Sequence, residues 1–209
     1  MVENSTPISL QQFEPGKLPG NQYAFTNMIY VSQQAYGQFV EESGKEPVYV
    51  KVKNFVLRLS QLHTLGPKEF AASSLQKEAM RIAKIDTVSM EPVRVRETNP
   101  LCALECSLDM VHMDPDCDRE VGKAVVIEQD EILKAVAAAF DGKFINYGEQ
   151  FPLALKDGKL IVKVKVNRLE PLKSQVSQTW GTVDEQTIVK CKVGQNSAAL
   201  LKFATNEVK

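Results

Sequence analysis

The clearest local pattern in the chain is FPLALKDGKLIVKVKV, in which Asp157-Gly158 separates two alternating apolar stretches. An Asp-Gly pair in this setting is typical of a type I′ hairpin turn, because both residues tolerate a positive φ. The alternation places every second side chain on one buried face: Leu153, Leu155, Leu160, Val162, Val164 and Val166. A chain that contains this segment has to build a sheet with an apolar face.

Alternation elsewhere in the chain indicates further strands. VYVKVKNFVLRL changes phase at Lys53-Asn54, as it would at a second hairpin turn. Other strands are expected over residues 23–31, 87–95, 102–110 and 187–193, and a short turn element over residues 33–39. Helix signals are few: Asp130 is a candidate cap for a helix that runs to Phe140, and Gly142 would stop it. The fold class predicted is α+β and β-rich.

Two stretches interrupt these patterns. Residues 1–16 are polar and contain Pro and Gly, which predicts a flexible tail. Arg96 to Pro100 (RETNP) separates two groups of strands and is the best candidate for a domain boundary. Residues 1–96 carry 11 Lys/Arg and 9 Asp/Glu, whereas residues 97–209 carry 14 and 17, so the first part is weakly basic and the second acidic.

Composition excludes several classes of protein. The chain has 209 residues and a formal net charge of −1, too little positive charge for a protein whose task is to neutralise nucleic-acid phosphates. Its longest apolar run, residues 135–140, is far too short to cross a bilayer, and MVENSTPISLQQ lacks a secretory signal pattern. Four cysteines in a chain of this length do not make a disulfide scaffold, which predicts a reducing, cytoplasmic compartment.

Common catalytic and nucleotide-binding motifs are missing from the sequence. Gly-Lys recurs along the chain, but no copy is followed by the Ser or Thr that a P-loop uses to hold Mg²⁺. GxGxxG, GxSxG and HExxH are not found either. We therefore expect no enzyme and no cofactor in this chain. The alternative, a stand-alone enzyme, would need a site built around His63, His112 or a cysteine.

One cluster imitates a zinc site. Cys102, Cys106, His112 and Cys117 together resemble a Cys₃His ligand set. Cys102 and Cys106, however, share one face of a predicted strand, where cysteine packs as a small hydrophobic residue. We expect no metal here, and the zinc alternative predicts stoichiometric metal by elemental analysis.

A second cluster imitates a calcium loop, in the acidic alternation from Asp114 to Glu120. Arg119 stands where the loop needs Gly for a sharp turn, and Val125 stands where it needs a bidentate Glu. An exposed acidic loop is the better interpretation.

Three stretches in this order resemble the N-terminal domain of the N-ethylmaleimide-sensitive fusion factor (Sec18-type) family of AAA ATPases. They are NQYAFTNMIYVS, in which a Thr-Asn pair ends an apolar stretch, NFVLRLSQLHTLGPKEFAASSLQKEAMRIAKIDTV, and DEILKAVAAAFDGKFINYGEQFPLALKDGKLIVKVKVNRLEPL. The resemblance covers residues 17–205. It implies a double-psi β-barrel subdomain at residues 1–94, packed against a smaller α/β subdomain at residues 97–209.

The resemblance conflicts with local propensity in one segment. SSLQKEAMRIAK favours a helix and has the capping-box spacing from Ser73 to Gln76. The family's fold instead implies strand and turn over much of residues 74–84. Because tertiary context often overrides propensity, strand and turn are the expectation here.

The function implied by the resemblance is recognition. N domains of this family bind the soluble attachment protein (SNAP) adaptors that coat SNARE bundles, which serves vesicle-mediated protein transport and membrane fusion. ATPase domains absent from this chain then use ATP and Mg²⁺ to disassemble the bundles. The resemblance implies a cytoplasmic chain that adaptors recruit to membranes. It implies no nucleic-acid partner and no direct membrane insertion, with a monomeric isolated domain and a hexameric full-length relative.

The resemblance also implies an adaptor-binding site of basic residues facing an acidic partner. Lys17 falls where the family has a basic residue upstream of its Thr-Asn pair, and Lys77 falls where it has the Arg of a Gln-Arg pair. Lysine keeps the charge at that position but loses the planar fork of arginine. The family's further basic pair would fall near Met113 and Asp114, where this sequence is acidic.

Two neighbours of Lys77 are candidates to replace that missing pair, namely Arg81 and Lys84. An alternative within the same fold is the N domain of a p97/Cdc48-like AAA ATPase, which holds ubiquitin-pathway adaptors.

Overall fold

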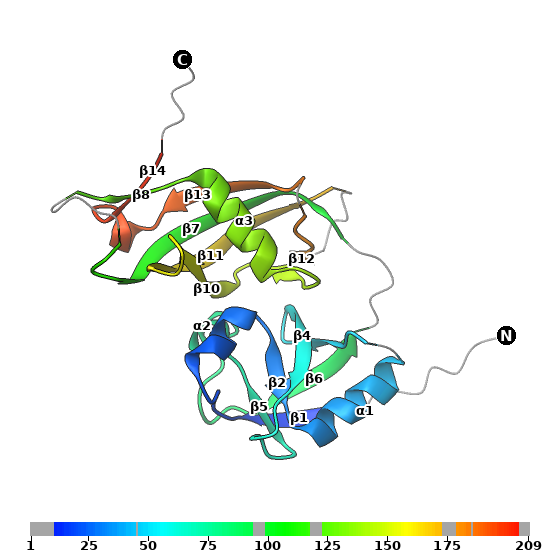
Figure 1. Ribbon diagram of the computed structural model, residues 1–209. Coiled ribbons are helices and arrows are strands. Elements are labelled where there is room, and N and C mark those ends of the chain that lie inside the picture. The colour runs from blue at the N-terminus through cyan, green and yellow to red at the C-terminus, as the bar shows by residue number, and fades with distance from the viewer. Residues whose placement is uncertain are drawn as a thin grey trace.

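A computed structural model describes residues 11–44, 46–93, 99–117, 123–172, 179–184 and 186–204 (Figure 1). The described chain is β-rich with few helices. It forms a closed six-stranded barrel from residues 11–93, here called the barrel half, and a four-stranded sheet with smaller pairs from residues 99–204, here called the C-terminal half. Within the described residues, no helix is both long and apolar enough to span a membrane.

The barrel half closes in the strand order β1-β5-β2-β4-β3-β6. The bounds of its strands are β1 Gln11–Pro15, β2 Ile29–Val31, β3 Tyr49–Val52, β4 Phe55–Gln61, β5 Glu69–Ala71 and β6 Val88–Val93. The pairs β1/β5 and β2/β4 are parallel and the other four are antiparallel. Closure leaves no free sheet edge around the ring, and apolar side chains fill its interior, Phe13, Leu57, Phe70 and Met90 among them.

The prediction of a flexible tail over residues 1–16 is wrong for its last part. Residues 1–10 lie outside the described residues, but Gln11–Pro15 forms β1 and closes the barrel against β5 and β6. Only Phe13 of this strand is buried, and its neighbours are polar. A strand with a single apolar anchor carries too little alternation for sequence analysis to detect.

Two further elements near the N-terminus differ from expectation. The strand expected over residues 23–31 is a 3₁₀ helix, η1 (Asn21–Thr26), followed by the short β2. Residues 33–39, expected to form a turn, begin helix α1 (Gln33–Ser43). The Oγ of Ser32 caps this helix by accepting a hydrogen bond from the N–H of Ala35 at 3.2 Å.

The hairpin at Lys53-Asn54 is confirmed, because Val52 pairs with Phe55 and leaves a two-residue loop between β3 and β4. Lys53 adopts a φ of 53°, as such a tight loop requires. The strand predicted over residues 87–95 is present as β6.

The expectation of strand and turn over residues 74–84 is wrong for residues 74–79. Ser74–Ala79 is helix α2, and Ser73 caps it. The Ser73 Oγ accepts from the N–H of Gln76 at 3.1 Å, while the Gln76 Oε1 accepts from the N–H of Ser73 at 3.0 Å. This reciprocal pair is the capping box that the local spacing predicted. Residues 80–84 continue from the helix as a turn.

The C-terminal half is built on a sheet in the order β10-β11-β7-β13. These strands are β7 Leu101–Met113, β10 Gln150–Leu155, β11 Leu160–Pro171 and β13 Ile188–Val193. The minor pairs are β8 (Val125–Ile127) with β14 (Leu201–Phe203), and β9 (Ile145–Asn146) with β12 (Trp180–Gly181). The remaining helices are α3 (Gln129–Ala139) and the 3₁₀ helix η2 (Gln195–Ser197).

The predicted Asp157-Gly158 hairpin joins β10 to β11, and Leu153 lies opposite Val162 and Leu155 opposite Leu160. The loop has four residues instead of two, and Lys156, Asp157 and Gly158 all have positive φ. The expected α3 is present, but its cap residue is Glu128 in place of Asp130, with no side-chain capping bond.

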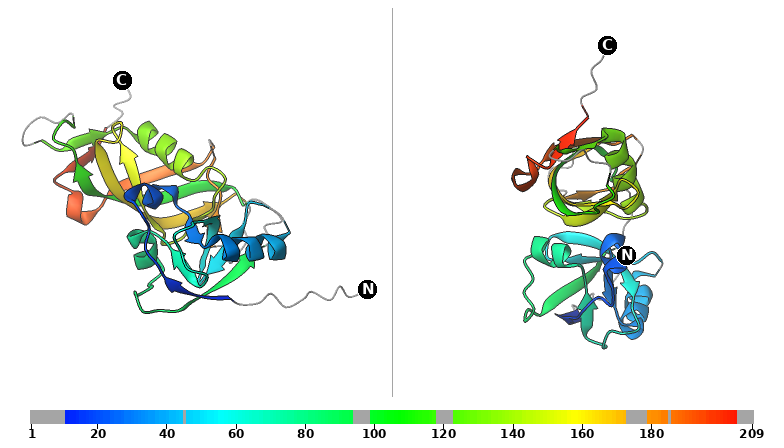
Figure 2. Two further views of the ribbon diagram at one scale, coloured as in Figure 1. Left: turned by 60° about the horizontal axis from the view of Figure 1, so that its bottom comes forward. Right: turned by 60° about the vertical axis from the view of Figure 1, so that its left-hand side comes forward.

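The two halves lie one above the other in Figure 1, and α2 and η1 face β10. The two halves also adjoin in the turned views of Figure 2. A small cluster of Tyr49, Val56 and Phe144 joins them, and Trp180 packs edge-to-face against Phe144 with ring centroids 4.5 Å apart. The Tyr49 hydroxyl donates to the carbonyl of Gly142 at 2.7 Å. Most of the predicted boundary RETNP lies outside the described residues, so the division at residues 94 and 97 stays a prediction.

Candidate functional site

Helix α2 carries Lys77, one of the four predicted basic residues. Its capping box fixes where the helix starts, and Met80 and Ile82, just beyond its end, are buried. With these ends anchored, Glu78 is exposed and Lys77 is half-buried on this six-residue helix. The local sequence therefore builds a rigid platform for Lys77.

Lys77 lies close to two other predicted site residues, Lys17 and Lys84. Its Nζ donates to the carbonyl of Gly16 at 3.5 Å, which brings it beside the next residue in the chain, Lys17. Partial burial, together with the charge of Lys84, lowers the pKa of Lys77. The structure thus brings Lys17, Lys77 and Lys84 close together. A carboxylate of a bound partner would relieve the repulsion between Lys77 and Lys84.

Arg81, the fourth predicted residue, lies in the turn after α2. It has a φ of 54°, and its carbonyl accepts a hydrogen bond from the Nζ of Lys53 at 2.7 Å. Lys53 is exposed and was not among the predicted residues. We call the set of Lys17, Lys53, Lys77, Arg81 and Lys84 the α2 basic surface.

Arg81 of the α2 basic surface lines a groove of about 340 Å³ between the two halves. From the barrel half, the groove is lined by Glu78, Ala79 and Arg81. From the C-terminal half it is lined by Tyr147 and Gly148, by Gln150 of β10, and by Lys165, Val166 and Asn167 of β11. Arg81 and Lys165 therefore place positive charge on both walls.

The groove also offers unsatisfied hydrogen-bonding groups. In the described part of the chain, the buried Oε1 of Gln150 and the buried Nδ2 of Asn167 have no partner. Buried polar atoms of this kind are normally paired, so the wall of the groove carries one unpaired acceptor and one unpaired donor just beneath its surface. Tyr147, whose side chain is 59% exposed, adds an aromatic surface at the rim.

Sequence reasoning missed the whole second wall of this groove. Alternation along β11 does predict that Lys165 faces away from the core, because Val164 and Val166 are buried on the other face. Nothing in the pattern indicates that this face lies across from α2. The pairing of two segments about 80 residues apart is a tertiary property.

The acidic position at which the sequence departs from the resembled family lies at another place in the fold. The N–H of Asp114 donates to the carbonyl of Lys159, at the loop between β10 and β11. Of the acidic alternation, Asp116 is exposed, whereas Asp118 and Glu120 lie outside the described residues.

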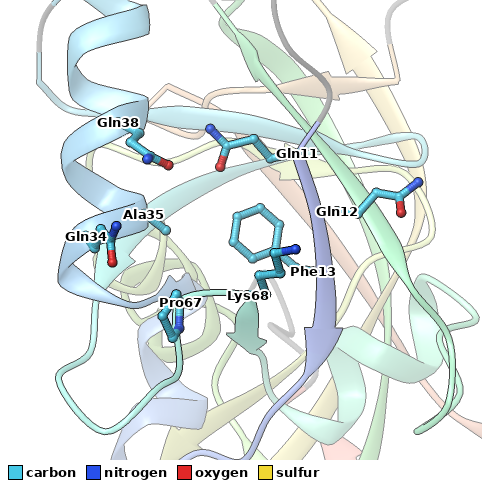
Figure 3. A pocket seen from close by; sticks show the side chains of 8 residues that line it. All are labelled: Gln11, Gln12, Phe13, Gln34, Ala35, Gln38, Pro67 and Lys68. Atoms are coloured by element: carbon cyan, nitrogen blue, oxygen red, sulfur yellow. The ribbon is translucent and has the colours of Figure 1, made fainter.

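A second hollow, of about 460 Å³, lies between β1 and α1 (Figure 3). The ring of Phe13 points into it, and the side chains of Gln11, Gln34 and Gln38 surround it. Lys68 is the charged residue of its lining. The glutamine amides that line this hollow suit hydrogen bonding and not acid–base chemistry.

The histidines of the enzyme alternative are both exposed. His63 shares a shallow hollow with Ser32, but the Ser32 hydroxyl is already the cap of α1. A nucleophilic serine would need its hydroxyl directed at the imidazole. The structure thus gives His63 no activated serine partner in this hollow.

The cysteines of the zinc alternative lie along β7 and beyond it. Cys106 and Cys117 are buried and Cys102 is half-buried, with its thiol 3.2 Å from the carbonyl of Glu170. Burial raises the pKa of Cys106, which disfavours the thiolate that a zinc ion requires. Across the described ranges, no three His, Cys, Asp or Glu side chains come together so that they could hold a metal ion.

No protein-family model and no curated protein matches the chain.

Proposed function

We propose that the chain is an adaptor-binding N domain of a vesicle-fusion AAA ATPase, and that its α2 basic surface binds an acidic SNAP adaptor. One observation carries the proposal: Lys77 contacts the carbonyl of Gly16 beside Lys17, and Arg81, just after the same helix, lines a groove. Arg81 and Lys84 are sequence neighbours of Lys77, but Gly16 and Lys77 are 61 residues apart, so it is the fold that brings Lys17 beside Lys77.

The chemistry of this surface suits an acidic protein partner. Exposed single charges contribute only about 0–1 kcal/mol each, so a cluster acts mainly through encounter rate and specificity. Ile85, beside Lys84, is 93% exposed and offers an apolar contact among the charges. A charged rim with apolar and aromatic contacts, here Ile85 and Tyr147, is a common composition for a protein interface.

The fold supports the same proposal. We propose that the six-stranded barrel is of the double-psi type, because its closed ring mixes two parallel strand pairs with four antiparallel ones. A barrel packed on a separate sheet is the arrangement that the resemblance implies. On this proposal the chain itself supplies recognition, and ATP hydrolysis belongs to domains outside it.

Retention on immobilised SNAP adaptor at low salt tests the proposal. We expect the wild-type chain to be retained and the double variant Lys17→Glu/Lys77→Glu to be lost. The matched control is Lys190→Glu/Lys202→Glu, which makes the same change of charge at exposed residues of β13 and β14 and should be retained.

Failure of the wild-type chain to bind at low salt would overturn the proposal. Retention on a ubiquitin-pathway adaptor in place of SNAP would assign the chain to the p97/Cdc48-like alternative.

A further inference from the structure

One side chain of the C-terminal half pairs with the barrel half as a strand would. The Oδ1 of Asn146 accepts from the N–H of Val56 at 2.7 Å, and its Nδ2 donates to the carbonyl of Val56 at 3.0 Å. Val56 lies in β4, so the amide extends the hydrogen bonding of a barrel strand. Asn146 and Val56 are both buried, and the single side-chain amide of Asn146 bonds both the N–H and the carbonyl of Val56.

Glu149 fixes the orientation of that amide. Its Oε2 accepts from both the N–H and the Nδ2 of Asn146, each at 2.8 Å. Glu149 is only 1% exposed, and its other carboxylate oxygen, Oε1, has no hydrogen-bond partner among the described residues. A half-satisfied buried carboxylate is costly when ionised, and it needs a structural or functional explanation.

Burial raises the pKa of Glu149 to about 7, although its hydrogen bonds with Asn146 and the charge of Lys143 act in the opposite direction. Lys143 precedes β9 and is the charged group that faces Glu149. Lys143 is in turn influenced by Arg58 of β4 and by Asp141, which follows α3. The side chain of Glu149 can thus exchange its proton close to neutral pH.

The residues between Asn146 and Glu149 are part of the groove. Tyr147 and Gly148 line it, and the N–H of Gly148 donates to the carbonyl of Val166 on the same wall. A shift of the Asn146–Glu149 turn relative to β4 would therefore move one wall of the groove relative to α2.

We propose that Asn146 and Glu149 act as positioning residues, a clamp that holds the second wall of the groove against the barrel half and that tightens when Glu149 takes up a proton. The consequence for adaptor binding rests on the proposed function. The clamp itself does not, because all of its contacts lie within this chain.

The direction follows from proton linkage. If the halves separate, water reaches Glu149 and its pKa returns toward the ordinary value of 4.5. The closed clamp therefore binds the proton more tightly than the open one, so acidification favours closure, and a rise of pH from the ordinary value of 4.5 through about 7 favours opening.

Trp180 provides the measurement, because it is the only tryptophan of the chain and lies in the cluster that joins the halves. We expect its fluorescence to change with pH in a single step with a midpoint near 7. The variant Glu149→Gln keeps an oxygen for both Asn146 bonds but cannot ionise. It should give the low-pH signal at every pH.

Histidine titration is the main competing cause of such a step. The control is His63→Gln/His112→Gln, which removes both histidines of the chain at exposed positions and should keep the step. The same step in Glu149→Gln, its loss in the control, or no step in the wild-type chain would each overturn the clamp.

A measurement on the wild-type chain alone makes the test independent of variant folding. We expect the Glu149 side-chain carboxyl carbon to titrate in NMR spectra with a midpoint near 7, coincident with the fluorescence step. A midpoint in the ordinary glutamate range would overturn the clamp. No adaptor is present in any of these experiments, so their failure leaves the proposed function to its own test.

Discussion

Asn146 is the residue on which the contact between the two halves depends most. It makes both of its bonds to Val56 through one amide, and the partner residue lies 90 positions away in the chain. Sequence analysis could not identify it, since an asparagine beside a glycine-containing turn is ordinary in a loop. Its role follows only from what the fold places opposite it.

Glu149 makes the stability of the protein depend on pH in a direction that is unusual for a carboxylate. Because its folded pKa is raised from 4.5 to about 7, its contribution is fully present below the unfolded value and is lost as pH rises through about 7. A shift of this size corresponds to roughly 3 kcal/mol at most. We expect the free energy of unfolding of Glu149→Gln, measured by urea denaturation, to change less between pH 5 and pH 8 than that of the wild-type chain. An unchanged pH profile would show that Glu149 is not the group responsible.

At the scale of single elements, α2 shows how local signals and family resemblance can disagree. The capping box Ser73-Gln76 correctly predicts the helix, whereas the expectation of strand and turn, taken from the resemblance, is wrong. Six residues are a short helix, so the reciprocal cap supplies much of what defines it.

Loss of this cap should destabilise the chain by about 1 kcal/mol. We expect Ser73→Ala to lower the free energy of unfolding by that amount, because the N–H of Gln76 loses its acceptor in a buried setting. Ser74→Ala is the matched control: Ser74 is exposed within the helix and should have little effect. Equal losses in both variants would contradict the role of the capping box.

The hairpin between β10 and β11 tests the backbone requirement of the Asp-Gly pair. Gly158 has a φ of 84° with no atom near the position of a Cβ, so Gly158→Ala should cost about 1 kcal/mol through backbone strain alone. Gly37, exposed inside α1, has equally open surroundings and no positive φ, so Gly37→Ala should instead stabilise by about 0.5–1 kcal/mol. Thermal unfolding of the two variants should shift in opposite directions.

These elements also mark how far the sequence could predict the fold. The two hairpins, the cysteine-bearing strand and α3 follow from strong alternation or helical spacing over many residues. Among the elements that were missed, β1 and the 3₁₀ helix before β2 are short, and Phe13 is their one buried residue. Their positions are fixed by barrel closure, which no local window contains.

At the scale of the whole molecule, the candidate site belongs to neither half alone. The predicted site residues Lys17, Lys77, Arg81 and Lys84 all belong to the barrel half, and Arg81 lines the groove from that side. The opposite wall, with Lys165 and the amides of Gln150 and Asn167, depends on how the halves meet. A weakly basic first part of a nearly neutral chain thus faces a second part whose local surface at the groove is also basic.

We expect this surface to bind an acidic adaptor through charge, and an equilibrium titration of the chain with purified SNAP adaptor at increasing salt tests that binding. We expect measurable affinity at about 50 mM salt that falls steeply by about 300 mM, where charges are screened beyond a few ångströms. Arg81→Glu/Lys165→Glu should weaken the low-salt affinity and flatten its dependence on salt, whereas Lys190→Glu/Lys202→Glu should not. Affinity that is insensitive to salt, or that is equal in both pairs of variants, would show that charge at the groove does not drive adaptor binding.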